Sequence, residues 1–204
     1  MSKYLDSLNN KKQPEIIEEI LTQAERFSTP TITDAGINLI IQILELSKAQ
    51  KVLEIGTAIG YSAIMMALNT EVEITTIERE QNAYELAQVN IAKAKLEKRI
   101  NLVFADALDY QTTELFDLIF IDAAKAQYLK FIEKYQNNLK VGGIIICDNL
   151  LFHGLVENDS LPESKNLKKL VKKIRDFNQA LVNHPDFSTY IYQIGDGMSI
   201  SIKK

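Results

Sequence analysis

The stretch VLEIGTAIGYS at residues 52–62 decides the fold that we expect for this chain. Its apolar, β-type beginning runs through Glu54 to Gly56, and Gly60 opens a helical pattern four residues later. Glycines at such a junction let a ligand approach bare backbone at the carboxyl end of a strand. Their G-x-x-x-G spacing differs from the G-x-G-x-x-G of nicotinamide-binding folds, and the two glycines alone would equally suit a plain tight turn.

Further apolar segments place this junction in an α/β fold. Including the first, five segments have the Ile, Val and Leu content of buried parallel strands. They lie at 51–55, 72–77, 100–104, 117–121 and 143–147. Helical patterns separate most of them, at 60–68, 81–95 and 126–138. This alternation predicts a doubly wound, mostly parallel sheet with right-handed crossovers.

The two ends of the chain extend this sheet. Helical patterns at 14–27 and through Ile37, Ile40 and Leu44 precede the first strand, and we expect them to cap one edge of the sheet. A helix at 165–183 is followed by two strands joined by the turn Gly195-Asp196-Gly197, which predicts a C-terminal antiparallel hairpin. We therefore expect one domain over residues 1–204, with a seven-stranded sheet and cap helices within 1–48.

The composition is that of an ordinary globular protein, with 46% hydrophobic and 25% charged residues. The net charge of −4 does not indicate a nucleic-acid binder, although a local basic patch can lie on an acidic protein. The single cysteine, Cys147, excludes an intramolecular disulfide, and its apolar surroundings indicate a core residue. No apolar run reaches the ~18 residues of a membrane span, so we expect a soluble, cytoplasmic protein.

Acids at the ends of the first three strands indicate a nucleotide-type cofactor. Glu78 lies 22 residues beyond Gly56, where an acid can accept hydrogen bonds from ribose hydroxyls. The turn at Asp106-Ala107 suits the reading of an adenine edge. Alternatively, Glu78 is a solvated acid at a helix start and Asp106 a helix cap. Glu54 at the end of the first strand disfavours a pyrophosphate and suits the ammonium and sulfonium groups of S-adenosylmethionine (SAM).

The fourth and fifth strands end in a second group of polar residues. Asp122 follows the fourth strand, and Asp148 with Asn149 follows the fifth. Adjacent parallel strands would gather these oxygen donors into one cluster suited to Mg²⁺, Mn²⁺ or Ca²⁺. The alternative is that the two acids are separate strand-end caps. Lys125, three residues after Asp122, favours the metal site, because a lysine beside a dication has a depressed pKa and can act as a general base.

Together these motifs resemble the metal-dependent class I SAM O-methyltransferases, the group that contains the catechol and caffeoyl-CoA O-methyltransferases. The resemblance extends from about residue 30 to the end and implies a Rossmann-like methyltransferase fold and a homodimer. It implies Lys125 and Asp122 as catalytic residues, and Mg²⁺ bound by Asp122, Asp148 and Asn149. The SAM contacts that it implies are Ile32, Glu54, Gly56, Ser62, Glu78, Asp106, Ala107 and Asp122.

Several longer stretches of the sequence are similar to one bacterial branch of that group, the tRNA 5-hydroxyuridine methyltransferases. They are found at 54–64, 121–128, 148–156 and in the tail from Asn183 to Ile200. The resemblance implies methylation of 5-hydroxyuridine at the wobble position of the tRNA anticodon loop. The base is unpaired there, and its 5-hydroxyl and 4-carbonyl oxygens are vicinal, as in catechol. The alternatives are a small-molecule enzyme for catechol or caffeoyl-type phenols and a nucleotide-binding module without catalysis.

An RNA substrate also needs a surface that faces phosphates. The helix predicted at 165–183 begins with six positive charges in eleven residues, on the face opposite its apolar stripe. These residues are Lys165, Lys168, Lys169, Lys172, Lys173 and Arg175. The alternative is the solvated face of an ordinary docked helix. His153, four residues after Asn149, is either a substrate contact or a surface loop histidine.

Overall fold

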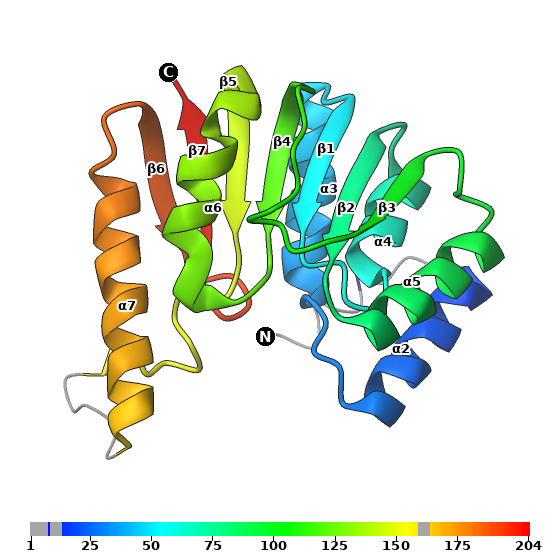
Figure 1. Cartoon of the computed structure of the whole chain (residues 1–204), viewed down its shortest axis with the longest axis horizontal. Helices are drawn as coiled ribbons and strands as arrows, with labels where there is room; N and C mark the ends of the chain where they lie inside the picture. Colours follow the sequence, from blue (N-terminus) through cyan, green and yellow to red (C-terminus); the bar gives the residue numbers. More distant parts are fainter. Residues whose placement is uncertain (1–7, 9–13, 159–163) are drawn as a thin grey trace.

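The protein is described by a computed structural model that covers residue 8, residues 14–158 and residues 164–204, so part of the predicted N-terminal cap lies outside the described residues. Seven strands form one sheet in the order β3-β2-β1-β4-β5-β7-β6. They are β1 (Lys51–Ile55), β2 (Glu73–Glu78), β3 (Ile100–Phe104), β4 (Phe116–Ile121), β5 (Leu139–Cys147), β6 (Phe187–Tyr192) and β7 (Met198–Lys203). β1 to β5 pair in parallel, and β7 pairs antiparallel with both β5 and β6. The expected Rossmann-like sheet with its C-terminal hairpin is confirmed (Figure 1).

Helices cover both faces of this sheet in the described part of the chain (Figure 1). They are α2 (Glu15–Phe27), α3 (Asp34–Ser47), α4 (Tyr61–Asn69), α5 (Gln81–Lys93), α6 (Tyr128–Tyr135) and α7 (Lys165–Val182). The helix expected at 126–138 is divided, because 3₁₀ turns at Lys125–Gln127 and Gln136–Asn138 flank α6. None of the described helices is both long and apolar enough to cross a membrane.

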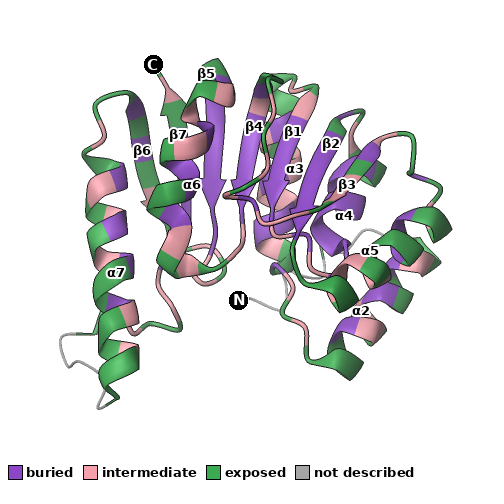
Figure 2. Ribbon diagram, viewed as in Figure 1, coloured by how far each residue is buried: buried purple, intermediate pink, exposed green. Residues whose placement is uncertain are grey.

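The core consists of two apolar clusters, one on each face of the sheet (Figure 2). One cluster contains side chains of the four helices α2, α3, α4 and α5 together with strand residues such as Val52 and Phe120. The other contains side chains of α6 and α7 together with Leu53 and Ile119. Neighbouring residues of β1 therefore point to opposite, fully covered faces, which is why parallel strands read as continuous apolar runs. Cys147 is fully buried in the second cluster, as expected for a core residue.

The expectation that α2 and α3 cap an edge of the sheet is wrong for α3. Ile37, Ile40 and Leu44 of α3 are almost completely buried in the same cluster as Leu118 and Phe120 of the central strand β4. Their apolar stripe needs a broad apolar surface, which the face of the sheet provides and an edge does not. α2 in turn packs on α4 and α5, so both helices belong to the layer over one face.

The register brings the ends of four parallel strands to one level. Ile55 of β1 pairs with Ile77 of β2 and with Ile121 of β4, and Ile121 pairs with Cys147 of β5. The residues that follow these four therefore form one row at the carboxyl edge of the sheet: Gly56, Glu78, Asp122 and Asp148. Backbone bonds continue the ladder into the row, since the amide of Asp122 donates to Ile55 (3.0 Å) and that of Asp148 donates to Ile121 (3.2 Å). The chain reverses its order of strands between β1 and β4, where open α/β sheets bind their ligands.

Candidate functional site

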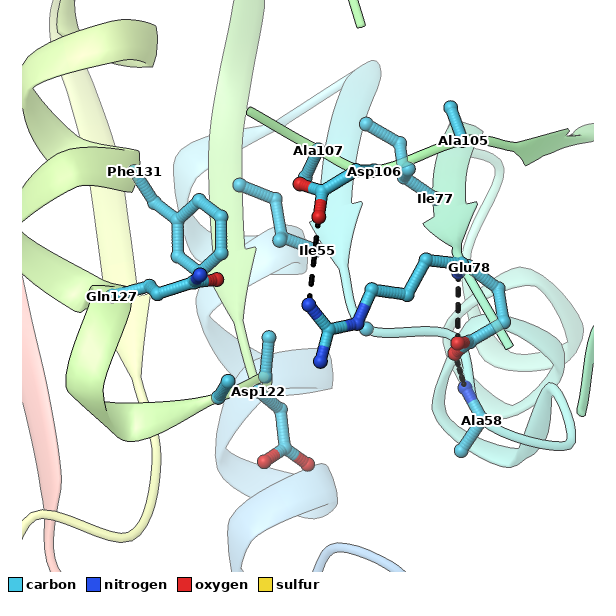
Figure 3. A pocket seen from close by; sticks show the side chains of 14 residues that line it. Ile55, Ala58, Ile77, Glu78, Ala105, Asp106, Ala107, Asp122, Gln127 and Phe131 are labelled. Carbon is cyan, nitrogen blue, oxygen red and sulfur yellow. Dashed lines mark hydrogen bonds and ion pairs between the residues drawn. The ribbon is translucent and has the colours of Figure 1, made fainter. Parts of the chain in front are cut away.

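Two adjoining cavities open at this row, one of about 160 Å³ and one of about 350 Å³. They share Gly56, Ala58, Asp122 and Ala123 as a common wall. The smaller cavity, called here the first cavity, also contacts the ends of β2 and β3. Figure 3 shows it with Phe131 and Gln127 on one side and Glu78 and Ala58 on the other.

Gly56 is required by close packing at the shared wall. Its φ is +99°, and a Cβ atom there would lie 2.2 Å from the carbonyl oxygen of Asp122. A side chain would therefore push the end of β1 away from the end of β4. Gly60 also has a positive φ, of +88°, and it precedes α4, as the glycine pattern predicts.

Glu78 is held rigidly at the rim of the first cavity. One carboxylate oxygen accepts the backbone N–H of Ala58 (2.8 Å), and the other accepts those of Arg79 (2.9 Å) and Glu80 (2.8 Å). These bonds fix the carboxylate and tie β2 to the glycine turn after β1. Because each carboxylate oxygen has two lone pairs, Glu78 still has acceptor capacity for a ligand.

Asp106 and Ala107 line the same cavity, as expected. One oxygen of Asp106 accepts the backbone N–H of Leu108 (2.8 Å) and so closes a local turn. Among the described residues no helix follows this turn before β4, so the alternative that Asp106 caps a helix is wrong. The other oxygen of Asp106 lies 3.4 Å from Nη1 of Arg79, which lines the cavity as well. The sequence did not identify Arg79, because nothing in its local pattern separates it from an ordinary surface arginine.

Glu54 is fully buried and lines neither of the two cavities. Its carboxylate accepts hydrogen bonds from the hydroxyls of Ser62 (2.5 Å) and Thr76 (2.5 Å). Burial raises the pKa of Glu54 from its ordinary 4.5 to about 7, against the lowering effect of these two hydroxyls. Ser62 lines the second cavity, so here it separates Glu54 from that cavity. The direct contact between Glu54 and a cofactor stays a prediction.

The raised pKa of Glu54 predicts that the free energy of unfolding depends on pH. Between pH 4.5 and about 7 the folded chain holds a proton that the unfolded chain has released, so stability falls as the pH rises through this interval. Glu54→Gln removes this contribution. We expect the difference in unfolding free energy between acidic and alkaline pH to become smaller by roughly 3 kcal/mol.

Urea unfolding at pH 5 and pH 8 in the presence of a chelator would measure this effect. Glu133→Gln is the matched control, because Glu133 is exposed on α6. An equal pH dependence in wild type and Glu54→Gln would mean that Glu54 titrates as an ordinary carboxyl.

The second, larger cavity gathers the residues expected to carry out chemistry. Lys125, Asn149 and His153 line it beside Asp122, although they come from different loops. Ile32, from the segment before α3, and Ser62 also line this cavity. Their expected contacts with SAM stay a prediction. The centroid of the Phe152 ring lies 5.8 Å from Lys125 Nζ, so an aromatic face borders the lysine.

The two predicted carboxylates lie close enough to affect each other. Burial and the neighbouring Asp122 raise the pKa of Asp148 to about 7. Burial raises the pKa of Asp122, and the positive charge of Lys125 partly opposes this. The carboxylate of Asp148 accepts the backbone N–H of Asn149 (2.7 Å), and the side-chain amide of Asn149 donates to the carboxylate of Asp122 (3.3 Å). The three residues therefore form one cluster.

This cluster fits a hard dication. Two carboxylates and an amide oxygen are the donors that Mg²⁺, Mn²⁺ and Ca²⁺ prefer, and a dication would relieve the repulsion that raises the acid pKa values. The Asn149 amide presents its nitrogen to Asp122, and a flip about its last torsion presents the oxygen instead. No group of three or more His, Cys, Asp or Glu side chains suited to a metal occurs among the described residues. The predicted ligand set differs from such a group because its third ligand is the side-chain amide of Asn149.

Five of the six predicted RNA-binding residues are exposed on α7. These are Lys165, Lys168, Lys169, Lys172 and Lys173, and none of them forms a salt bridge within the described residues. The N-terminal half of α7 projects beyond the carboxyl edge of the sheet, on the side of the cavities (Figure 1).

Arg175 has a different role from the one predicted. Its guanidinium donates to the backbone carbonyls of Val156 (2.9 Å) and Asn158 (2.6 Å). It therefore ties the loop after β5 to α7, and these donors are not directed at a phosphate. The charge pattern alone cannot distinguish this use of an arginine from a surface role.

Sequence patterns also missed two buried residues that support the site. Asn90 of α5 donates to the carbonyl of Ile59 (2.9 Å) and so holds the turn before Gly60. The hydroxyl of Tyr128 donates to the carbonyl of Asp148 (3.0 Å). Both occupy positions in amphipathic helices where only the tertiary contact reveals the function.

Comparisons with known proteins agree with this geometry. The family described as O-methyltransferase matches residues 7–204. The caffeoyl-CoA O-methyltransferase of Populus kitakamiensis is 32% identical over 170 residues, which cover 78% of this chain and 72% of that protein. A Staphylococcus aureus structure, provisionally named a caffeoyl-CoA O-methyltransferase, is 36% identical with a TM-score of 0.93, covering 99% of this chain and 98% of that one. The O-methyltransferase of Bacillus cereus, solved with S-adenosylhomocysteine (SAH), is 25% identical with a TM-score of 0.85, covering 99% and 96%.

Proposed function

This chain belongs to the O-methyltransferase family, and from that premise we propose that it is a metal-dependent enzyme that methylates 5-hydroxyuridine in tRNA. Its general activity, without regard to the acceptor, is that of a SAM-dependent O-methyltransferase of the caffeoyl-CoA type. One observation carries the metal-dependent part of the proposal. Asp122, Lys125 and Asn149 line the second cavity, which adjoins the first cavity, bordered by Glu78.

The first cavity suits the adenosine part of SAM. Glu78 offers a fixed carboxylate for ribose hydroxyls, and Asp106 and Ala107 lie where an adenine edge would be read. Gly56 leaves backbone exposed between the two cavities, so a ligand can extend from one into the other. SAM supplies an electrophilic methyl group on a sulfonium centre.

The second cavity suits the acceptor. Asp122, Asp148 and Asn149 would hold the dication, which supplies Lewis-acid chemistry that lowers the pKa of a nearby hydroxyl. Lys125 lines the same cavity and is the base that we propose for the hydroxyl proton. The rigid backbone positions of the acids direct the acceptor oxygen, and such positioning contributes strongly to displacement reactions.

The tRNA acceptor is supported by the exposed lysines of α7, a helix whose N-terminal half extends beyond the carboxyl edge of the sheet (Figure 1) and could contact phosphates there. A second candidate is a small phenolic acceptor with two vicinal oxygens. The names of the plant relatives favour it, and a cavity of about 350 Å³ has room for a single aromatic ring. The homodimer stays a prediction, for which the exposed Tyr190 and Tyr192 on the edge strand β6 offer a surface.

The decisive experiment incubates the protein with SAM, Mg²⁺ and tRNA that contains 5-hydroxyuridine. We expect 5-methoxyuridine in the tRNA hydrolysate by mass spectrometry, with catechol methylated slowly under the same conditions. Efficient methylation of catechol without reaction of the tRNA would reject tRNA in favour of the second candidate. Binding of SAH without turnover of either acceptor would leave a nucleotide-binding module.

A charge-reversed variant, Lys169→Glu with Lys172→Glu, tests the α7 surface in the same assay. It removes phosphate neighbours, so we expect roughly tenfold weaker tRNA binding and a flatter salt dependence, with turnover of a free nucleoside unchanged. The matched control is Lys95→Glu with Lys98→Glu, because these exposed lysines precede β3 at the opposite edge of the sheet. An equal loss in both variants would identify a general effect of net charge.

A further inference from the structure

The loop after β5 is held in an unusual backbone conformation. Asn149, Phe152 and His153 have φ values of +65°, +47° and +55°, and Gly154 has +76°. Left-handed backbone is unfavourable for residues with a side chain and persists only where surrounding contacts enforce it. This loop carries the metal-site residue Asn149 and the cavity residue His153, so the contacts that enforce its shape matter for function.

The turn between β6 and β7 supplies those contacts. The backbone carbonyl of Gly197 accepts the amide of Leu150 (2.9 Å), and that of Asp196 accepts the amide of Leu151 (2.8 Å). The side chain of Asp196 reaches further, since its Oδ1 accepts the amide of His153 at 2.6 Å. One residue of the hairpin thus binds the loop through its main chain and its carboxylate.

Steric fit shows how closely the turn and the loop approach. Gly197 has a φ of +87°, and a Cβ atom there would lie 2.4 Å from Cγ of Leu151 and 2.9 Å from its backbone nitrogen. The Gly-Asp-Gly sequence is therefore more than a hairpin signal. Its second glycine lets the loop lie against the turn, and its aspartate fastens it there.

The second carboxylate oxygen of Asp196 has no hydrogen-bond partner among the described residues, although it is buried. Nδ1 of His153 lies 3.8 Å from it, and the imidazole is 80% exposed. A buried acceptor without a donor is costly, whereas a rotation of an exposed ring is not. A small rotation of the His153 ring would supply the missing donor.

We propose that Asp196 is a positioning residue that sets the orientation and tautomer of His153, and that His153 accepts a hydrogen bond from the methyl acceptor. With Nδ1–H donated to Asp196 Oδ2, the ring must present Nε2 as an acceptor. His153 lines the second cavity together with Lys125, so its imidazole is within reach of a substrate that enters there. The inference rests on the proposed methyl transfer, but it holds for a tRNA or a phenolic acceptor.

The tautomer can be measured without any substrate. The chain has two histidines, so long-range ¹H–¹⁵N spectra of the imidazoles can be assigned with a His184→Ala variant. At about pH 8.5 we expect His153 to carry its proton on Nδ1. In Asp196→Asn, one oxygen can still accept the His153 amide, but an N–H group faces the ring, so the proton should move to Nε2. An Nε2–H tautomer in wild type, or no change in Asp196→Asn, would overturn the inference.

Kinetics separate the orienting role from a purely structural one. In Asp196→Asn and in His153→Ala we expect KM for the acceptor to rise about tenfold, with SAH affinity and metal affinity by calorimetry unchanged. The double variant should lose no more than either single variant, because one interaction is removed in all three. Asp176→Asn, an exposed aspartate of α7, is the control for loss of one charge.

Other outcomes contradict the inference. Normal acceptor KM in Asp196→Asn together with a loss in Asp196→Ala would make Asp196 a loop anchor only. Additive losses in the double variant would mean that the two residues act separately. If no acceptor is turned over at all, the proposed function fails, while the tautomer measurement still decides the positioning role.

Discussion

Replacing Lys125 by alanine is expected to lower kcat by about 10²- to 10⁴-fold, the usual contribution of a general base. Lys125 lines the second cavity beside Asp122 and Asn149, where an acceptor hydroxyl would lose its proton. Affinity for SAH should stay within about twofold of wild type, because Lys125 does not line the first cavity. Single-turnover methyl transfer and calorimetry with SAH would measure the two effects.

Two further variants separate a base from a mere positive charge. Lys125→Arg keeps the charge that lowers the pKa of Asp122, but a guanidinium does not release its proton. We expect Lys125→Arg to be as inactive as Lys125→Ala. Lys130→Ala on the exposed side of α6 is the matched control. Recovery of activity in Lys125→Arg would assign Lys125 an electrostatic role instead.

Replacing Asp148 by alanine is expected to abolish metal-stimulated turnover. Asp148 is 5% exposed, beside Asp122, and the removal of one of two carboxylates leaves too few charged ligands for a hard dication. Binding of SAH should persist, because Asp148 lines neither of the two cavities described above. Calorimetry with Mg²⁺ or Mn²⁺, and separately with SAH, would show whether the two sites are independent. An equal loss of both would contradict the assignment of Asp148 to the metal.

The pKa of Asp148, raised to about 7, also predicts how metal affinity depends on pH. Below this pH the metal must displace a proton from Asp148, so affinity should fall by up to about tenfold per pH unit. Above it the carboxylate is ionised already and affinity should level off. Titrations of metal at pH 6, 7 and 8 in two buffers of different ionisation enthalpy would detect the released proton. A pH-independent affinity would mean that Asp148 is ionised throughout.

Much of the site follows from the sequence because it lies at strand ends. The first strand, 51–55, and the third, 100–104, agree with β1 and β3, and parallel pairing then brings Gly56, Glu78 and Asp122 to one edge. The alternation of side chains along a strand, and the rule that open sheets bind ligands at the carboxyl ends of their strands, can both be applied from local sequence patterns alone. The bounds of β5 were harder to predict, since the pattern at 143–147 does not show that the strand begins at Leu139.

Other assignments depended on contacts between distant segments. The sequence indicated Arg175 as a phosphate contact, but its donors are used by a loop 17 to 19 residues earlier in the chain. α3 is expected at an edge of the sheet, but its apolar stripe is buried in one cluster with Leu118 and Phe120 of β4, some 80 residues later. The charge of a side chain or the apolar stripe of a helix indicates which kind of partner it requires. Several segments elsewhere in the chain can provide such a partner, so the sequence alone does not identify it.

The sequence by itself determined the doubly wound sheet, its hairpin and the row of polar residues at its carboxyl edge, because strand periodicity and parallel register are repeated, local properties. Only the tertiary structure decided which of these residues meet a cavity. It buried Glu54 beneath Ser62 and Thr76, placed Arg79 against Asp106, and brought Asp196 to the amide of His153, 43 residues away in the chain. Burial and hydrogen-bond partners are properties of the packed chain, and no local pattern contains them.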